Sequence, residues 1–455
     1  MLDDMQYGTP AEVAKALARH APKCIESLLD PAVGNGVLLD PILNRLSALP
    51  KHVICIDSNK DLLVGLQGKF KERLGNSLRL INADFLEWSS PLNMRYRRIG
   101  FDCIVMNPPF MGRKNGLVKV DLGADFPGIG GASHFAPVEV AFVLRATKLL
   151  KPGGRLLAVV PLSLVGSITT RWARELLLRL GAVRYVHELP RFTFRHLEAR
   201  TYLFIFERRR GSGTIVLCNH DLARPKRLFV TNAELPPEIR FDYSFHKAFK
   251  WHESLATSFP QLEWSKVTDV ASIHRGSIDA VARDRRVLHT SHYRDGSWKL
   301  PNDIGRFRRD RSQKGVQKGD LLVKRVGRDC GRSIGKVRGH QGLACSDCIL
   351  IIRPKEKALS ARLLFALRVV LAWSGGLPLI QRTTGASYLT AKELSRLSIP
   401  LGLADQFPQE YAHYKSAVAE RQIDAMLSIE HNIRRSLTTC ISELASENST
   451  GTIRY

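Results

Sequence analysis

Short apolar runs alternate with longer segments of helical spacing over the first half of the chain. Apolar residues dominate 27–30, 53–56, 78–81 and 101–106, which is typical of strands buried on both faces of a parallel sheet. The segments between these runs are long enough for crossover helices. The pattern therefore predicts an α/β fold with an open sheet, in which the carboxyl ends of the strands line one crevice.

The same alternation continues to residue 207. We predict helices over 138–150 and 171–180 and strands over 155–161, 183–189 and 201–207. Residues 111–133 are polar and glycine-rich without clear periodicity, which is typical of a mobile loop over a site. The basic, glycine-containing run 208–213 predicts a domain boundary.

The first predicted strand ends in a glycine turn. Asp30 and Pro31 are followed by Gly34 and Gly36, and strand, glycine turn and helix together open a nucleotide-binding βαβ unit. The spacing is not GxGxxG and no Lys-Ser/Thr follows, which disfavours a dinucleotide or a triphosphate. Upstream, Thr9 at a cap position and Pro10 at a first helical position predict a helix over 9–20.

Acidic residues end the next two strands. Asp57 follows the glycine turn by roughly 20 residues, where an acid accepts hydrogen bonds from ribose hydroxyls. The alternative role for Asp57 is to cap the next helix. Asp84 is placed to bond an adenine amino group, and Phe85 to pack on or near that ring.

The fourth strand ends in a rigid corner, Asn107-Pro108-Pro109-Phe110. Each proline fixes its own φ and biases the preceding residue toward extended geometry. The Asn107 amide oxygen and the Pro108 carbonyl would accept hydrogen bonds from an exocyclic amino group, while Phe110 stacks on the ring that carries it. The alternative is an ordinary turn at the end of a strand.

The composition of the chain predicts a polyanionic partner. The 455 residues carry a formal charge of +25, so nucleic acid is the first candidate partner and an acidic membrane surface the second. No apolar stretch is long enough to span a membrane, and the acidic start shows no secretory leader. We therefore expect a cytoplasmic protein associated with the nucleoid through DNA.

The eight cysteines do not predict a disulfide framework or a metal site. Cys345 and Cys348, with Cys330 and His340 upstream, form the one candidate zinc cluster. The second CxxC or HxxxH pair of a structural zinc site is missing, and the residues after Cys348 resemble a core strand. We expect no bound metal.

In their order, these clusters together with Lys151-Pro-Gly-Gly154 resemble the γ-class amino-methyltransferases of restriction-modification systems, which act on adenine N6 in DNA. The resemblance covers residues 7 to about 207. It implies a Rossmann-like, S-adenosylmethionine-dependent domain. The family more often has Tyr where Phe110 stands, but a ring suffices for stacking.

The resemblance also implies roles for the candidate residues. Thr9, Pro10, Asp30, Pro31, Gly34 and Gly36 would hold the methionine end of S-adenosyl-L-methionine, Asp57 its ribose, and Asp84 and Phe85 its adenine. The catalytic corner, Asn107, Pro108 and Phe110, would hold a flipped-out target base. Phe194 matches the second stacking ring of the family, with Phe192 close enough to leave that assignment open.

The second half of the chain resembles the target-recognition domains in specificity subunits of type I restriction systems. The match covers roughly 265–403, and residues 275–338 are rich in Lys and Arg interleaved with aromatic residues. The arginines that we expect to touch DNA are Arg306, Arg308, Arg309, Arg325 and Arg328. A basic run is otherwise typical of a solvated face.

We predict four segments in the chain. They are a methyltransferase domain over 1–210, a connector over 211–265, a target-recognition domain over 266–403, and a long helical segment over 404–455. The helical segment carries apolar residues at three- and four-residue spacing, which favours packing within a monomer over pairing in a dimer.

The leading hypothesis is a site-specific adenine-N6 DNA methyltransferase that acts on double-stranded DNA and protects sites from a partner restriction endonuclease. We expect no nuclease domain in front of the cofactor motif. The alternatives are methylation of cytosine N4, RNA or a protein glutamine amide, and a non-catalytic DNA-specificity module.

Overall fold

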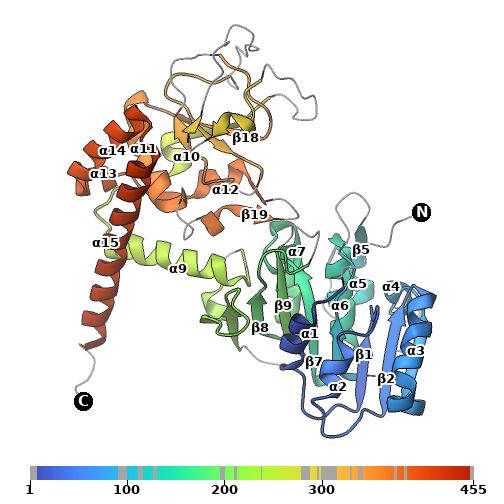
Figure 1. Cartoon of the computed structure of the whole chain (residues 1–455). Coiled ribbons are helices and arrows are strands. Elements are labelled where there is room, and N and C mark those ends of the chain that lie inside the picture. Colours follow the sequence, from blue (N-terminus) through green and yellow to red (C-terminus); the bar gives the residue numbers. More distant parts are fainter. Residues whose placement is uncertain are drawn as a thin grey trace. The chain divides into compact units, whose positions relative to one another are not determined.

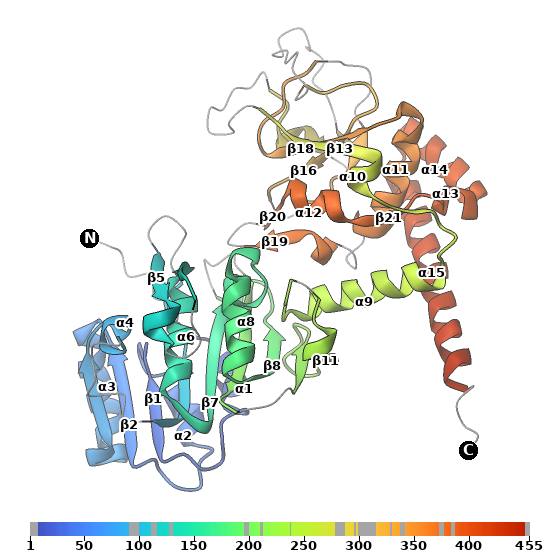
Figure 2. The ribbon, with the colours of Figure 1, turned by 180° about the vertical axis from the view of Figure 1, so that it is seen from behind.

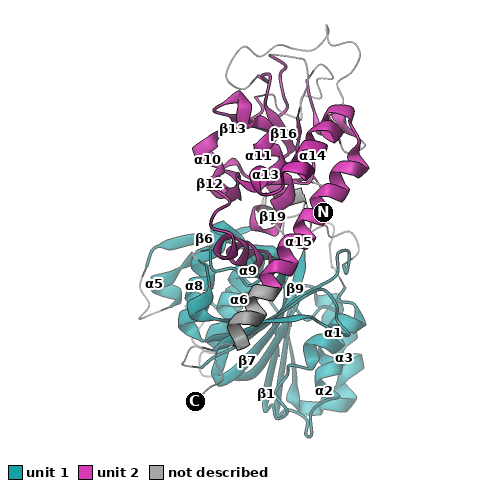
Figure 3. Cartoon of the chain, turned by 90° about the vertical axis from the view of Figure 1, so that its left-hand side faces the viewer, with its two compact units in different colours: residues 1–246, 383–385 teal, residues 247–382, 386–455 magenta. Residues whose placement is uncertain are grey.

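The computed structural model divides the chain into two compact units, residues 1–246 with 383–385 and residues 247–382 with 386–455 (Figure 3). The structure describes residues 8–90, 100–110, 116–126, 131–194, 200–209, 213–236, 238–277, 287–294, 297–298, 315–327, 330–336, 342–372, 377–383 and 387–450. Each unit has its own sheet and its own core.

Unit 1 is built on a nine-stranded sheet in the order β11-β10-β8-β9-β7-β4-β1-β2-β3. Its strands are β1 (Ser27–Asp30), β2 (His52–Asp57), β3 (Leu78–Asn82), β4 (Phe101–Met106), β7 (Leu150–Pro161), β8 (Ala182–Glu188), β9 (Thr201–Glu207), β10 (Thr214–Cys218) and β11 (Arg227–Thr231). The run from β3 to β7 is parallel, and β9 lies antiparallel between β7 and β8. The predicted α/β fold with a largely parallel sheet is confirmed.

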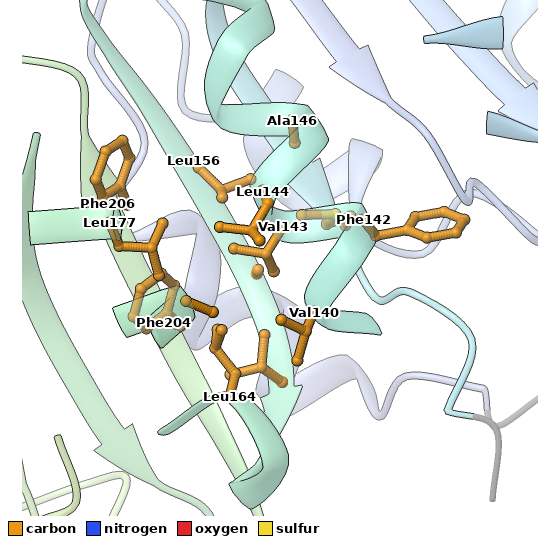
Figure 4. Close-up of a cluster of buried hydrophobic side chains, with 14 of the residues drawn as sticks. Val140, Phe142, Val143, Leu144, Ala146, Leu156, Leu164, Leu177, Phe204 and Phe206 are labelled. Carbon is orange, nitrogen blue, oxygen red and sulfur yellow. The ribbon is translucent and has the colours of Figure 1, made fainter. Parts of the chain in front are cut away.

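Helices cover both faces of this sheet (Figures 1 and 2). They are α1 (Ala11–Ala18), α2 (Leu39–Leu43), α3 (Lys60–Leu74), α4 (Phe85–Trp88), α6 (Val138–Leu149), α7 (Leu162–Val165) and α8 (Arg171–Leu180). Residues of β9 alternate between two cores: Phe204 and Phe206 pack with α6 and α8, as Figure 4 shows, whereas Leu203 and Ile205 join the core beneath α1 to α3. This two-sided burial is why the strand sequences are continuously apolar.

Two expectations for unit 1 are wrong. The predicted domain boundary at 210 and connector from 211 fail because β10 and β11 extend the sheet, so the segment after β9 only turns the chain. The predicted mobile loop over 111–133 contains β5 (Leu117–Asp121) and α5 (Leu122–Asp125), and β5 pairs antiparallel with β6 (Ser133–Pro137), which begins where that range ends. Val120 and Ala136 of this pair are buried in the core, which holds it in place.

Unit 2 begins within α9 (Tyr243–Ser258) and contains a four-stranded sheet in the order β13-β18-β16-β17. Three two-stranded pairs, β12-β21, β14-β15 and β19-β20, accompany this sheet. The strands of this half of the chain are β12 (Trp264–Lys266), β13 (Ala271–Arg275), β14 (Tyr293–Arg294), β15 (Ser297–Trp298), β16 (Leu321–Lys324), β17 (Gly335–Lys336), β18 (Ile349–Pro354), β19 (Gln381–Thr383), β20 (Ser387–Leu389) and β21 (Ser398–Pro400). The helices that accompany them are α10 (Val267–Val270), α11 (Ser360–Leu367) and α12 (Ala391–Arg396).

The C-terminal segment is helical, as predicted, but it is broken. It comprises α13 (Leu403–Gln406), α14 (Pro408–Glu420) and α15 (Ile423–Thr450), with Arg421 in the left-handed region at φ 63° between the last two. Tyr414 and Met426 pack with Phe365 of α11 and Leu255 of α9 in one core of this unit. The apolar residues of this segment therefore pack against other helices of the same chain.

Gly36 allows a prediction about the turn after β1. Its φ is +73°, and a Cβ there would lie 2.6 Å from Leu66 Cδ2 and 2.8 Å from Phe70 Cε2. We expect Gly36→Ala to lower the free energy of unfolding by roughly 2–4 kcal/mol through backbone strain and overpacking. Calorimetric thermal unfolding measures the loss.

Gly65 is the matched control, because it lies inside α3 with no heavy atom within 4 Å of a Cβ built on it. Gly65→Ala should raise stability by about 0.5–1 kcal/mol. Equal melting temperatures for the two variants would contradict the packing described for Gly36.

Candidate active site

Three candidate residues lie at the carboxyl ends of neighbouring strands. Asp30 ends β1, Asp57 ends β2, and Asn107 follows β4; the sheet order β4-β1-β2 makes these strands adjacent. Parallel pairing brings their ends to the same edge of the sheet. The predicted crevice therefore has its polar residues on one edge.

Asp30 is a buried carboxyl with an open acceptor. Its side chain is 0% exposed, and its Oδ1 accepts a hydrogen bond from the Ala32 backbone N–H at 3.2 Å. Its Oδ2 has no hydrogen-bond partner within the described part of the chain. Burial, with the nearby charge of Asp57 adding to it, raises the pKa of Asp30 from 3.8 to about 8. A cationic ligand group would satisfy this oxygen and stabilise its ionised form.

The glycine turn after Asp30 is tied to the end of β2. Gly34 has a φ of +53°, and its N–H donates to Asp57 Oδ2 at 2.9 Å. No heavy atom lies within 4 Å of a Cβ built on Gly34, in contrast to the close packing at Gly36. The two glycines thus have different roles: Gly36 lets the turn pack on α3, and Gly34 leaves open space beside its backbone.

Asp57 is held in place and keeps acceptor capacity. Its Oδ1 accepts from the Asn59 N–H at 2.9 Å, and its Oδ2 from Gly34. An ionised carboxylate offers about four lone-pair sites, so roughly two remain for ligand hydroxyls. The alternative that Asp57 caps the next helix is wrong, because Asn59 caps α3 by accepting from the Asp61 N–H at 2.9 Å.

The acid and aromatic after β3 have separate roles. Asp84 caps α4, its Oδ1 accepting from the Leu86 and Glu87 N–H groups at 2.6 and 3.2 Å. The Phe85 ring is 1% exposed and packs against Phe142 with ring centroids 5.0 Å apart. The ring therefore belongs to the core of unit 1, and its predicted contact with the cofactor adenine stays a prediction.

Thr9 does not cap α1 as predicted. Pro10 is the N-cap residue, with no side-chain cap hydrogen bond, and its extended geometry (φ −60°, ψ 142°) moves Thr9 outside the cap position. The Thr9 hydroxyl instead accepts a hydrogen bond from Asn107 Nδ2 at 3.0 Å. A fixed partner on the NH2 side sets the plane of the amide, and therefore the direction of its oxygen.

The corner after β4 places two aromatic rings together. Pro108 is buried, Pro109 is exposed, and Phe110 is half-buried. The Phe110 ring meets the Phe194 ring edge-to-face, with centroids 6.4 Å apart and planes at 82°. Phe194 is 3% exposed, whereas Phe192 is 59% exposed, so Phe194 is the ring beside the corner.

The predicted DNA-contacting arginines are described only in part. Arg306, Arg308, Arg309 and Arg328 lie outside the described residues. Arg325 follows β16, and its side chain is 19% exposed. Its Nε donates to the Asp347 carbonyl at 2.6 Å, so a neighbour already holds one edge of its guanidinium.

The described residues contain neither a metal-binding cluster nor a membrane-spanning helix. No group of three His, Cys, Asp or Glu side chains there is arranged to hold a metal ion. Nor does any helix in that part of the chain combine the length and apolar character needed to cross a bilayer.

Comparison with known proteins gives a family match to part of the chain. Residues 55–190 match the model described as Eco57I restriction-modification methylase. This stretch begins within β2 and runs through β8, so it includes Asp57 and the corner at Asn107. A search of curated proteins found no match.

Solved structures give fold likenesses at low identity. A type IIL restriction-modification enzyme, MmeI, in complex with DNA is 12% identical, with a TM-score of 0.51, and the match covers 94% of this chain and 71% of that one. A type I restriction-modification methyltransferase subunit from Streptococcus thermophilus is 22% identical (TM-score 0.40, 50% of this chain and 51% of that one). A class I S-adenosylmethionine-dependent methyltransferase from Listeria monocytogenes is 20% identical (TM-score 0.38, 48% and 67%). The chain thus spans about half the length of the type I subunit.

The raised pKa of Asp30 predicts a pH dependence. The folded state holds this proton more tightly than the unfolded chain, so the stability from Asp30 is fully present below about pH 4 and is lost as the pH rises to about 8. Between these values the free energy of unfolding of the wild type should fall, relative to Asp30→Asn, by on the order of 1 kcal/mol per pH unit. Calorimetry of both proteins at several pH values measures the difference, and a pH-independent difference would show that Asp30 is ionised in the folded protein.

Proposed function

We propose that this chain is an S-adenosylmethionine-dependent DNA methyltransferase that modifies adenine N6 at specific sites in duplex DNA, as the modification part of a restriction-modification system. The observation that carries the proposal is the convergence of Asp30, Asp57 and Asn107 on adjacent strand ends. The match of residues 55–190 to a restriction-modification methylase family supports the reaction class.

The residues at the sheet edge fit the cofactor. When bound, S-adenosyl-L-methionine supplies an electrophilic methyl group on a sulfonium, and it carries an ammonium on its methionine end. Asp30 would receive the ammonium, because its buried Oδ2 lacks a donor among the described residues and its pKa is high without a cation. The open space at Gly34 would admit the methionine backbone, and the spare lone pairs of Asp57 would accept from ribose hydroxyls.

The corner after β4 fits a planar base with an exocyclic amino group. Asn107 Oδ1 and the Pro108 carbonyl would accept hydrogen bonds from that group and orient its lone pair toward the methyl donor. Positioning and electrostatics carry the rate in this arrangement, so a strong general base is not required. Phe110 and Phe194 would stack on the base, and because they now meet edge-to-face, a base entering between them would have to turn one ring.

DNA is the substrate that the charge favours. A formal charge of +25 suits a polyanion, and a base inside a duplex must be flipped out, at a cost of a few kcal/mol that stacking on Phe110 and Phe194 would recover. Unit 2, which resembles a target-recognition domain in sequence, would supply the site specificity. The adenine preference rests on the resemblance to the γ-class family, in which Asn at the first position of the corner leans toward adenine and Ser is more often found for cytosine N4.

Methyl transfer in vitro tests the proposal. The purified chain is incubated with methyl-labelled S-adenosyl-L-methionine and, separately, with duplex DNA, RNA and a protein mixture, and the products are hydrolysed and identified by mass spectrometry. We expect N6-methyladenine from duplex DNA alone. Label found only in N4-methylcytosine, RNA or protein would overturn the adenine-DNA assignment, and cofactor binding without any transfer would point to a non-catalytic specificity module.

Thr9 provides a test of the corner geometry. If its hydroxyl orients the Asn107 amide, Thr9→Ala should lower kcat about tenfold, the equivalent of losing one orienting hydrogen bond, and leave the Kd for S-adenosyl-L-methionine within about twofold. Thr9→Ser keeps the hydroxyl and should restore most of the rate. A weakened cofactor affinity with an unchanged kcat would assign Thr9 to the cofactor instead.

A further inference from the structure

Two arginines meet at one end of the sheet in unit 2. Arg275 is the last residue of β13, Arg325 follows β16, and Asp347 lies just before β18, which runs between these two strands (Figure 2). The strand register pairs Arg275 with Leu350 and Lys324 with Ile349. The three charged side chains therefore come from neighbouring strands at the same sheet end.

Asp347 holds both guanidinium groups. The Nε of Arg275 and the Nε of Arg325 donate to its backbone carbonyl at 3.2 and 2.6 Å. Both Nη2 groups face its carboxylate: that of Arg275 is hydrogen-bonded to Oδ2, and that of Arg325 lies 3.6 Å from the same atom. One aspartate thus fixes the orientation of two planar, five-donor groups.

The charges of this cluster do not cancel. Among the residues that the structure describes, two guanidinium ions face one carboxylate, and burial together with the charge of Arg275 lowers the pKa of Arg325. The contacts with Asp347 use the Nε and Nη2 edge of each guanidinium. No hydrogen bond within the described residues engages either Nη1, so the Nη1–Nη2 end of each guanidinium can meet an outside acceptor. The Arg275 side chain is 55% exposed, so an acceptor in solvent can reach it.

The backbone beneath the cluster is tightly fixed. A Cβ on Gly276 would lie 2.1 Å from the Ser346 carbonyl oxygen, so glycine lets the chain leaving β13 press against the segment before Asp347. The Arg325 N–H donates to the Cys348 carbonyl at 2.8 Å, and the Arg325 carbonyl accepts from the Leu389 N–H at 2.8 Å. Groups held in this way lose little entropy on binding, which is what a preorganised contact requires.

We propose that Arg275 and Arg325, whose guanidinium groups are held in orientation by Asp347, contact the DNA bound by this protein. These three residues are called the clamp. Each fork matches paired oxygen or nitrogen acceptors, either the oxygens of a backbone phosphate or the O6 and N7 edge of a guanine. The clamp adds a named contact to the proposed function and rests on it, because duplex DNA is the ligand that both share.

The test measures duplex-DNA binding by the full chain at several salt concentrations and on a library of sequences. The variants are Arg275→Ala and Arg325→Ala, and the control is Arg362→Ala, which removes another exposed arginine of unit 2 that pairs with a single carboxylate, Asp405, at 2.5 and 2.6 Å. A phosphate contact predicts weaker binding to all sequences and a salt slope that is smaller by about 0.9 per variant. A guanine contact predicts a loss of discrimination at one base pair of about ten- to hundredfold.

The Arg275→Lys variant distinguishes a clamp that contacts DNA from a cluster that only stabilises the fold. It also tests the clamp if the alanine variants misfold. It keeps the charge but loses the fork, so a phosphate contact would keep its salt slope and a guanine contact would lose its base preference. If both alanine variants fold and bind DNA with the affinity, salt slope and sequence profile of the Arg362→Ala control, the clamp is refuted. Failure of the wild type itself to bind or methylate DNA would instead refute the proposed function.

Discussion

The backbone register that joins β4, β1 and β2 is the constraint on which the candidate site depends. Leu28 and Leu29 pair with Cys103 and Ile104 on one side, and β1 pairs along its whole length with β2 on the other. These hydrogen bonds bring Asp30, Asp57 and Asn107 to one edge of the sheet. A slip of two residues in either pair would move one carboxylate or the amide by about 7 Å along its strand, beyond reach of a shared ligand.

Side-chain hydrogen bonds then link the strand ends to segments that are distant in sequence. Asp57 accepts a hydrogen bond from the turn at Gly34, and Thr9 accepts one from Asn107, so four stretches of the chain meet at this edge of the sheet. Burial of Asp30 costs folding free energy, because its carboxyl is buried with one oxygen that lacks a donor among the described residues. A cationic ligand would offset that cost, which ties the stability of the sheet edge to binding.

Much of this architecture follows from local pattern. The buried parallel strands were predictable because continuous apolar runs are needed on a sheet covered on both faces, and the turn at Gly34 because few other residues adopt positive φ. The role of Thr9 was not, because a Thr-Pro pair has the same sequence signature whether or not the hydroxyl caps the helix. The burial of the Phe85 ring was likewise not predictable, because an aromatic after an acid shows no sign of which side of the sheet it faces.

The domain boundary predicted at 210 was wrong for a different reason. Basic and glycine residues after β9 have the composition of a linker, yet β10 and β11 continue the sheet, because strand pairing at an edge depends on partners far away in sequence. The Arg275–Asp347–Arg325 cluster is likewise invisible in the sequence, since 72 residues separate Arg275 from Asp347 and only the register of β13, β18 and β16 brings them together.

Single-molecule methylome sequencing of genomic DNA tests the central claim most directly, in cells that express either the wild-type chain or Asn107→Ala. The account predicts N6-methyladenine in one defined sequence context with the wild type and none with the variant, because Asn107 would orient the amino group that receives the methyl. Unmodified adenine in the wild-type cells, although the purified protein binds S-adenosyl-L-methionine, would contradict the account. Modification that persists in the Asn107→Ala cells would show that the corner after β4 is not the catalytic site.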